Sequence, residues 1–303
     1  MKNTFLIIIS LLCISCVQKK SQYNNQITQA IPIKSNLIIK FHNINKTYQK
    51  LTEMNWWKDV KEIEMINEKL EKINRLHRYF QFNKIFNNRE LYLSFMLIGE
   101  HNSEFLLTTS ILDIQSDLNK LLMSKFGKTN KQKVYEGITI NHIKLKSDET
   151  DDFDMFYFMH DGLFVYSLSE ILIQASIRQL HTNTNFFKID PIAKLDQNLP
   201  KYSDLNILVK TAFLEKMIGQ KNIFLNSDTW SCFDVELEDD NILLNGVTNR
   251  GDIKYLKDNK YSDAKQSNIE QFLPRHIKGF YTYNINNDLD LNEVMKFRTT
   301  NKL

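Results

Sequence analysis

Three stretches of the chain begin with a proline and continue alike, and this recurrence sets the main limit on the fold. They start at Pro32, Pro200 and Pro274, and each runs through polar residues into an apolar strand, a short turn and a helix start. Proline suits the approach to a strand because it has no N–H to give to a sheet ladder. Unequal spacing excludes a short fixed-period solenoid. The sequence predicts a degenerate repeat, with chance similarity of generic strand–helix units as the alternative.

Helix patterns and hairpin patterns alternate between these starts. From Trp57 to Phe80, apolar residues recur at steps of three and four, which predicts one long amphipathic helix. Two further helices are expected, one ending at Gly127 in the left-handed conformation and one capped by Ser169. The mixture predicts an α+β fold of antiparallel sheets with packed helices, in degenerate repeated strand–helix–hairpin units. Apolar runs joined by turn residues predict three hairpins, which turn at Gly99–Ser103, Asp161–Gly162 and Asp239–Asn241.

The first twenty residues predict the location of the protein. Lys2 precedes an apolar run, Phe5–Ile14, which is too short to cross a bilayer and is typical of a secretory signal. Small Ser15 before Cys16 resembles a bacterial lipobox, although Cys13 stands where leucine is usual. We expect Cys16 to carry the lipid and to hold the protein on a membrane. A plain cleaved signal with incidental cysteines is the alternative.

The residues after the anchor suggest an orientation. Surface-exported lipoproteins of Bacteroidetes-type bacteria tend to carry acidic residues there, whereas residues 17–20 of this chain are VQKK. We therefore expect a lipid-anchored outer-membrane protein of the cell envelope that faces the periplasm. The expected divisions are a signal peptide (1–15), a flexible tether (16–30), a first α+β unit with the long helix (31–195), and a second α+β unit plus a truncated third unit (196–303).

Composition excludes some classes of function. The formal net charge is +3, and basic residues are mixed with acidic ones, so we expect no nucleic-acid partner. Removal of Cys13 and lipidation of Cys16 leave Cys232 without a partner for an intrachain disulfide. We expect Cys232 to be a buried and inert thiol on a strand. The folded part therefore has to be stabilised by packing.

The second and third proline-led stretches carry a resemblance to a family. The run DTWSCFDVELEDDNILLNGVT contains Trp230 and ends a hairpin strand near Gly246, and a polar stretch then leads to Leu273 and Pro274 before the next strand. This order resembles Bacteroidetes-type envelope lipoproteins of unknown function, built from domain-of-unknown-function repeats. The resemblance implies no activity. Members are usually longer, which implies that the third unit is truncated.

No residue pattern predicts catalysis, a metal or a cofactor. The seven histidines are scattered, without HExxH or a pair at metal-ligand spacing. The acidic run Asp148–Asp154 has neither the glycine nor the final glutamate of an EF-hand loop. Phe126–Thr129 and Ser262–Lys265 match only fragments of a P-loop and of a serine–lysine motif. We expect no catalytic residue, no metal ligand and no cofactor.

The expected function is therefore non-catalytic. Adjacent Trp56 and Trp57 are a possible ligand or partner surface, with packing at a helix start as the alternative. We expect a lipid-anchored scaffold or binding module with a possible envelope protein partner. One rival is a periplasmic carrier whose cavity would be lined by some of the 20 phenylalanines and 9 methionines. The other is an envelope hydrolase with an unrecognised site.

Overall fold

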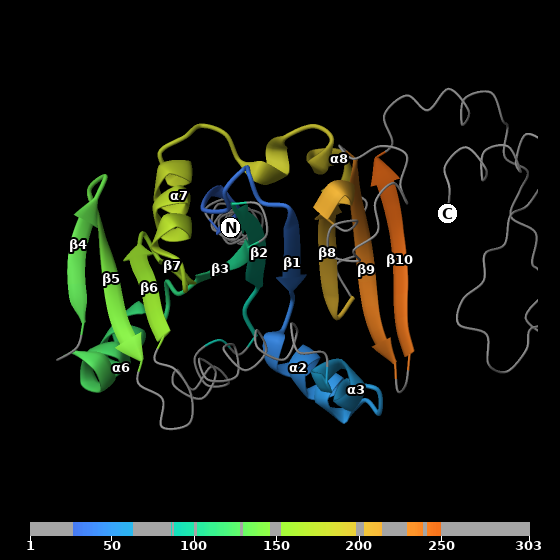
Figure 1. The fold of residues 1–303 in the computed structure, drawn as a ribbon, viewed down its shortest axis with the longest axis horizontal. Coiled ribbons are helices and arrows are strands. Elements are labelled where there is room, and N and C mark those ends of the chain that lie inside the picture. Colours follow the sequence, from blue (N-terminus) through green and yellow to red (C-terminus); the bar gives the residue numbers. More distant parts are fainter. Residues whose placement is uncertain are drawn as a thin grey trace, which may run out of the picture.

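A computed structural model gives the fold, and it describes residues 27–62, 86, 88–99, 102–127, 130–145, 153–197, 203–213, 229–238 and 241–249. Ten strands of this part form one sheet in the order β10-β9-β8-β1-β2-β3-β7-β6-β5-β4 (Figure 1). Every neighbouring pair is antiparallel. The predicted α+β class with an antiparallel sheet is confirmed. Both predicted units contribute to this sheet, because β1 pairs with β8.

The described elements have the following bounds. The strands are β1 (Leu37–Phe41), β2 (Leu91–Ile98), β3 (Asn102–Ser110), β4 (Lys131–Tyr135), β5 (Ile138–Leu145), β6 (Phe153–His160), β7 (Leu163–Ser167), β8 (Leu205–Lys210), β9 (Trp230–Glu238) and β10 (Asn241–Asn249). The helices are α2 (Ile44–Glu53), α3 (Trp57–Glu62), α6 (Gln115–Phe126), α7 (Glu170–Leu180), the 3-10 helix η1 (Phe186–Lys188) and α8 (Ile192–Gln197).

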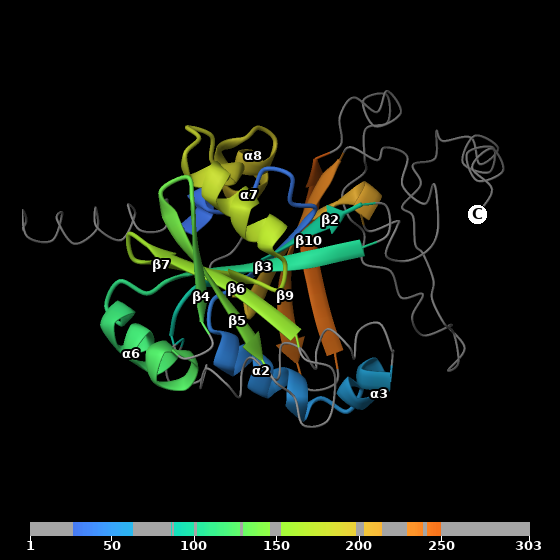
Figure 2. The same ribbon diagram turned by 60° about the vertical axis from the view of Figure 1, so that its left-hand side comes forward.

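Helices cover both faces of the sheet. Figure 2 shows α7 and α8 on one side, and α2, α3 and α6 on the other. Successive side chains of a strand point to opposite faces, so each strand serves two cores. In β2, Tyr92 packs into the core under α7 and α8, while Leu91 and Leu93 pack into the core over α6. This three-layer arrangement explains why the central strands are apolar on both faces.

The turn residues set the hairpins. β6 and β7 are joined by Asp161 and Gly162 with φ of 46° and 75°, the positive values that a two-residue type I′ turn requires. The predicted hairpins β2–β3, β6–β7 and β9–β10 are all confirmed. A further turn of this kind at Glu136–Gly137 joins β4 to β5. Sequence reasoning missed β4 because its exposed KQKVY has no buried apolar face.

Two predicted helix ends differ in detail from the structure. Gly127 follows α6 with φ of −54°, so the prediction of a left-handed glycine is wrong. Its N–H bonds to the Met123 carbonyl, which continues the helical pattern. Ser169 does stand at the start of α7, but its side chain makes no capping bond. Of the predicted helix from Trp57 to Phe80, α3 covers the first part and the remainder lies outside the described residues.

The end of the predicted tether is packed. Residues 27–29 form a helical turn, and Ile27, Ala30 and Ile31 are buried in the core beside α7. The Ser176 hydroxyl of α7 donates a hydrogen bond of 2.7 Å to the Ala30 carbonyl. The prediction of a flexible tether is therefore wrong for residues 27–30. Residues 27–30 had been assigned to the tether because residues 17–30 are polar and show no apolar periodicity.

Candidate functional site

One polar cluster contains residue types that are common in active sites, and it lies where β8 pairs with β1 and with β9. Buried Asn206 of β8 donates its two amide hydrogens to the Ser203 hydroxyl at 2.8 Å and to Asp234 Oδ1 at 2.6 Å. The Asn206 oxygen accepts from His42 Nε2 at 2.7 Å, which makes Nε2 the protonated ring nitrogen. Serine, histidine and aspartate thus meet around one asparagine.

This cluster is not arranged for nucleophilic catalysis. An activated serine needs a base within hydrogen-bond distance of its hydroxyl. Ser203 and His42 both bond to Asn206 and not to each other. The cluster instead joins the end of β1 to β8 and β9, so its chemistry is that of a structural junction.

The carboxyl group of this cluster is desolvated. Burial raises the pKa of Asp234 above its usual value of 3.8, opposed by the hydrogen bond from Asn206. The folded protein therefore holds the Asp234 proton more tightly than the unfolded chain does. The stabilisation that comes from the protonated Asp234 is complete below pH 3.8 and is lost as pH rises through the folded-state pKa. The ionised Asp234 carboxylate therefore destabilises the folded protein at neutral pH.

We expect Asp234→Asn to stabilise the protein at pH 7, because the amide oxygen still accepts from Asn206 and carries no charge. The gain over wild type should shrink as pH falls and vanish below the usual aspartate pKa. Thermal melting from pH 3 to pH 8 would measure it. Asp113→Asn is the control with the opposite sign, because the hydrogen bond from Arg89 lowers the pKa of Asp113. A lower melting temperature for Asp234→Asn at pH 7 would contradict the assignment.

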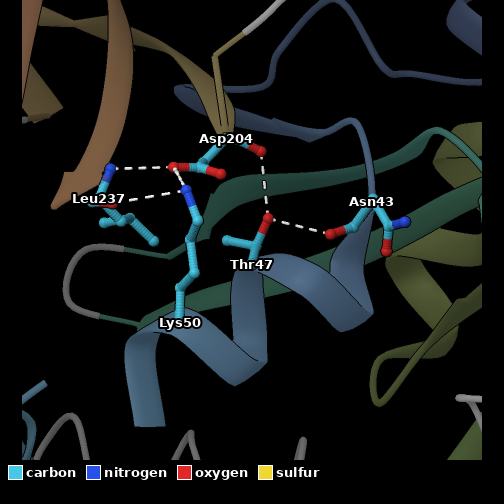
Figure 3. Close-up of polar contacts among 5 residues, drawn as sticks. All are labelled: Asn43, Thr47, Lys50, Asp204 and Leu237. Carbon is cyan, nitrogen blue, oxygen red and sulfur yellow. Dashed lines mark hydrogen bonds and ion pairs between the residues drawn. The ribbon is translucent and has the colours of Figure 1, made fainter. Parts of the chain in front are cut away.

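A second cluster lies beside the first and holds α2 against the same end of β8 and β9 (Figure 3). Asp204 Oδ2 accepts from Lys50 Nζ at 2.7 Å and from the Leu237 N–H at 3.0 Å. The Thr47 hydroxyl lies within hydrogen-bond distance of the Asn43 and Asp204 carbonyl oxygens, at 3.0 and 3.1 Å. These contacts join a helix of the first predicted unit to two strands of the second.

The first unit has a matching acceptor in front of β1. Asn36 Oδ1 accepts from the Leu97 N–H of β2 at 3.4 Å, and the Asn36 N–H bonds to the Phe95 carbonyl at 2.8 Å. In the second unit the Asp204 N–H bonds to the Val235 carbonyl at 3.1 Å. Sequence reasoning missed both acceptors, although a signal exists. Ser-Asn and Ser-Asp stand at the same distance after Pro32 and Pro200.

The predicted tryptophan surface is largely a core contact. Trp57 is 9% exposed and packs with Met54 and Val235 under α3. The Trp56 ring meets the Trp57 ring edge to face at 6.1 Å and is half-buried. The two rings are in contact. Trp56 is the more accessible of the two to a ligand or partner, because Trp57 is buried.

Of the other sequence-predicted residues, those that the structure describes form no site. Cys232 is buried as expected, and burial raises the pKa of its thiol to about 11, so it is protonated at neutral pH. Asp154, from the acidic run, bonds to His142 Nε2 at 2.6 Å. The other acidic residues of that run and Cys16 lie outside the described residues. Within the part that the structure describes, three or more potential metal ligands nowhere gather, and no helix is long and apolar enough to span a bilayer.

The two edges of the sheet differ in their protection. Charged side chains on an edge strand discourage pairing with another strand, and β4 exposes Lys131 and Lys133. β10, at the other edge in Figure 1, has no charged residue among its nine. Its large apolar side chains are 41–57% exposed: Ile242, Leu243, Leu244 and Val247. β10 therefore has the features of a strand that another strand covers.

Comparison with known proteins gives no relative. No family model matches the chain, and neither a curated protein nor a solved structure matches it. A functional proposal therefore depends on the residues described above.

Proposed function

We propose that this protein is a lipid-anchored, non-catalytic lipoprotein of the cell envelope that serves as a scaffold or binding module. The observation that carries the proposal is Cys16, which follows a basic start, a short apolar run and small Ser15. The engagement of His42 and Ser203 by Asn206 supports the non-catalytic part. The anchor resembles a bacterial lipobox, and we assign the protein to the periplasmic side of the outer membrane because residues 17–20, VQKK, include no acidic residue.

The distance between anchor and fold fits this arrangement. Each buried CH₂ of an acyl chain contributes about 0.8 kcal/mol, so several chains on one cysteine hold a protein stably on a bilayer. Ile27 is the first described residue of the core, and ten residues, 17–26, lie between it and Cys16 in the sequence. Ten residues reach at most about 35 Å. A lipid on Cys16 would therefore hold Ile27 within about 35 Å of the membrane surface, as suits a scaffold for envelope partners.

Replacing Cys16 by serine should abolish lipidation, because the diacylglyceryl group is attached to the cysteine thiol through a thioether. A cell grown with a fatty-acid analogue should label wild type and not Cys16→Ser, and the variant should leave the membrane fraction. Cys13→Ser is the matched control, since it removes a neighbouring thiol and should keep the label. Labelled Cys16→Ser in the membrane fraction would refute the lipoprotein assignment.

We also propose that the scaffold consists of two related strand–helix–hairpin units. The register supports this, because Leu37 pairs with Phe95 and the matching Leu205 pairs with Val235. The strand lengths agree as well: β3 and β10 both have nine residues and both close a hairpin. β1 and β8 pair antiparallel around Ile39 and Ile207, which relates the units by an approximate two-fold axis through the sheet.

A further inference from the structure

The edge strand β10 has the composition of a surface that pairs with another molecule. Among the described strands it pairs with β9 alone, and eight of its nine residues are exposed. It carries no charged residue, and charges are a common means by which natural edge strands prevent pairing with another chain. At the other edge β4 has such charges in Lys131 and Lys133. Of the two edges, β10 is therefore the one that accepts a strand from outside.

The sequence of β10 is complementary to itself in the antiparallel direction. Its nine residues, NILLNGVTN, have asparagine at the first, the central and the last position. When two copies run antiparallel with all nine residues paired, Asn245 lies opposite Asn245 of the second copy, and Asn241 lies opposite Asn249. Each asparagine amide both donates and accepts hydrogen bonds, so opposed asparagines can satisfy one another. In the same register Leu243 lies opposite Val247, and this apolar pair occurs twice.

Gly246 prepares the other face of the strand for the same partner. A Cβ there would collide with the Phe233 ring of β9, so the ring covers the glycine within one molecule. In the nine-residue register Leu244 of the second copy lies opposite Gly246, and opposed residues point to the same face. The Leu244 side chain, 57% exposed in the single molecule, then packs over the glycine beside Phe233. Pairing therefore covers apolar side chains on both faces of β10.

We infer that two copies of this protein associate through β10, antiparallel and with the two-fold axis at Asn245, so that the two ten-stranded sheets continue as one. Each copy offers the same strand to the other, so the contact is closed and gives a dimer. The second copy is the occupant because the order of residues in β10 fits its own reverse along all nine positions. The lysines of β4 oppose growth of the sheet at the far edge.

A cysteine at the axis tests the register in the full-length protein. Directly opposed residues of adjacent strands have Cα atoms about 4.5–5.5 Å apart, within the range of a disulfide. Asn245→Cys should therefore give disulfide-linked dimers in most molecules under copper–phenanthroline oxidation. Thr248→Cys is the matched control, since it is also exposed on β10 but its two copies stand six residues apart, about 20 Å. It should give little dimer, and wild type with buried Cys232 supplies the background.

A lysine at the axis gives a measurement without added cysteines. Asn245→Lys places two like charges directly opposite each other, which destabilises a strand pair. Native mass spectrometry of the detergent-solubilised protein should show a dimer for wild type and a monomer for Asn245→Lys. Thermal melting of the variant, followed by circular dichroism, checks that the monomer is folded. If Asn245→Lys does not fold, the cross-linking experiment decides.

Three results would overturn the inference. A monomeric wild type would do so, and it is the result expected if another segment of the same chain covers β10. Equal cross-linking of Asn245→Cys and Thr248→Cys would show a different register. A dimer that persists in folded Asn245→Lys would show that the copies meet through another surface. The fatty-acid label on Cys16 is measured separately, so failure here leaves the lipid-anchor test unaffected.

Discussion

Replacing Phe164 by alanine is expected to lower the free energy of unfolding by about 3–5 kcal/mol, the usual cost of removing a buried phenylalanine. Phe164 lies on β7 and is 0% exposed. Its ring centroid is 5.9 Å from Phe86, 5.8 Å from Tyr157 and 6.1 Å from Tyr166, so the ring is the centre of an aromatic group. Alanine removes all three ring contacts and leaves a cavity in a closely packed layer. Urea unfolding would measure the loss.

Ile171→Ala on α7 is the control for this experiment. Its side chain is 59% exposed, so its truncation should change the free energy of unfolding by less than about 0.5 kcal/mol. A similarly small loss for Phe164→Ala would mean that this core layer is loosely packed. That result would favour the periplasmic carrier over the scaffold, because a carrier needs a deformable apolar interior.

Local sequence signals predicted much of the sheet. Asp161–Gly162 marks a tight turn because an aspartate and a glycine tolerate positive φ, and the apolar strands on either side then have to pair. The failures arose where the local signal was weak or ambiguous. Glycine can adopt both left-handed and right-handed helical backbone conformations, so Gly127 alone did not indicate which one follows α6. β4 has no buried apolar face that would have indicated a strand.

The candidate junctions could not be predicted in the same way. His42 and Asn206 are 164 residues apart in sequence, and only the pairing of β1 with β8 brings them to 2.7 Å. A sequence pattern records spacing along the chain and not the order of strands in a sheet. The proline-led stretches did indicate that β1 and β8 have similar surroundings. Their antiparallel contact is a tertiary result that this similarity does not contain.

Replacing Asp204 by alanine is expected to cost about 2–3 kcal/mol of unfolding free energy. Most of the loss comes from the Leu237 N–H, which is left without its side-chain acceptor, at about 1–3 kcal/mol. The ion pair with Lys50 adds less, about 0–1 kcal/mol, because the lysine side chain is 36% exposed and water screens the charges. Urea unfolding at low and high salt would separate the two parts.

Asp204→Asn is the matched variant, because Asn36 already accepts from the Leu97 N–H at the corresponding place in the first unit. If the two units are related, an asparagine oxygen should replace the aspartate oxygen at Leu237, and only the ion pair is lost. Asp204→Asn should then cost about 1 kcal/mol or less, and high salt should reduce its difference from wild type. Asn36→Ala should be milder than Asp204→Ala, because its hydrogen bond is longer at 3.4 Å. Equal losses for Asp204→Asn and Asp204→Ala would show that asparagine cannot take this place, and the relation between the units would be refuted.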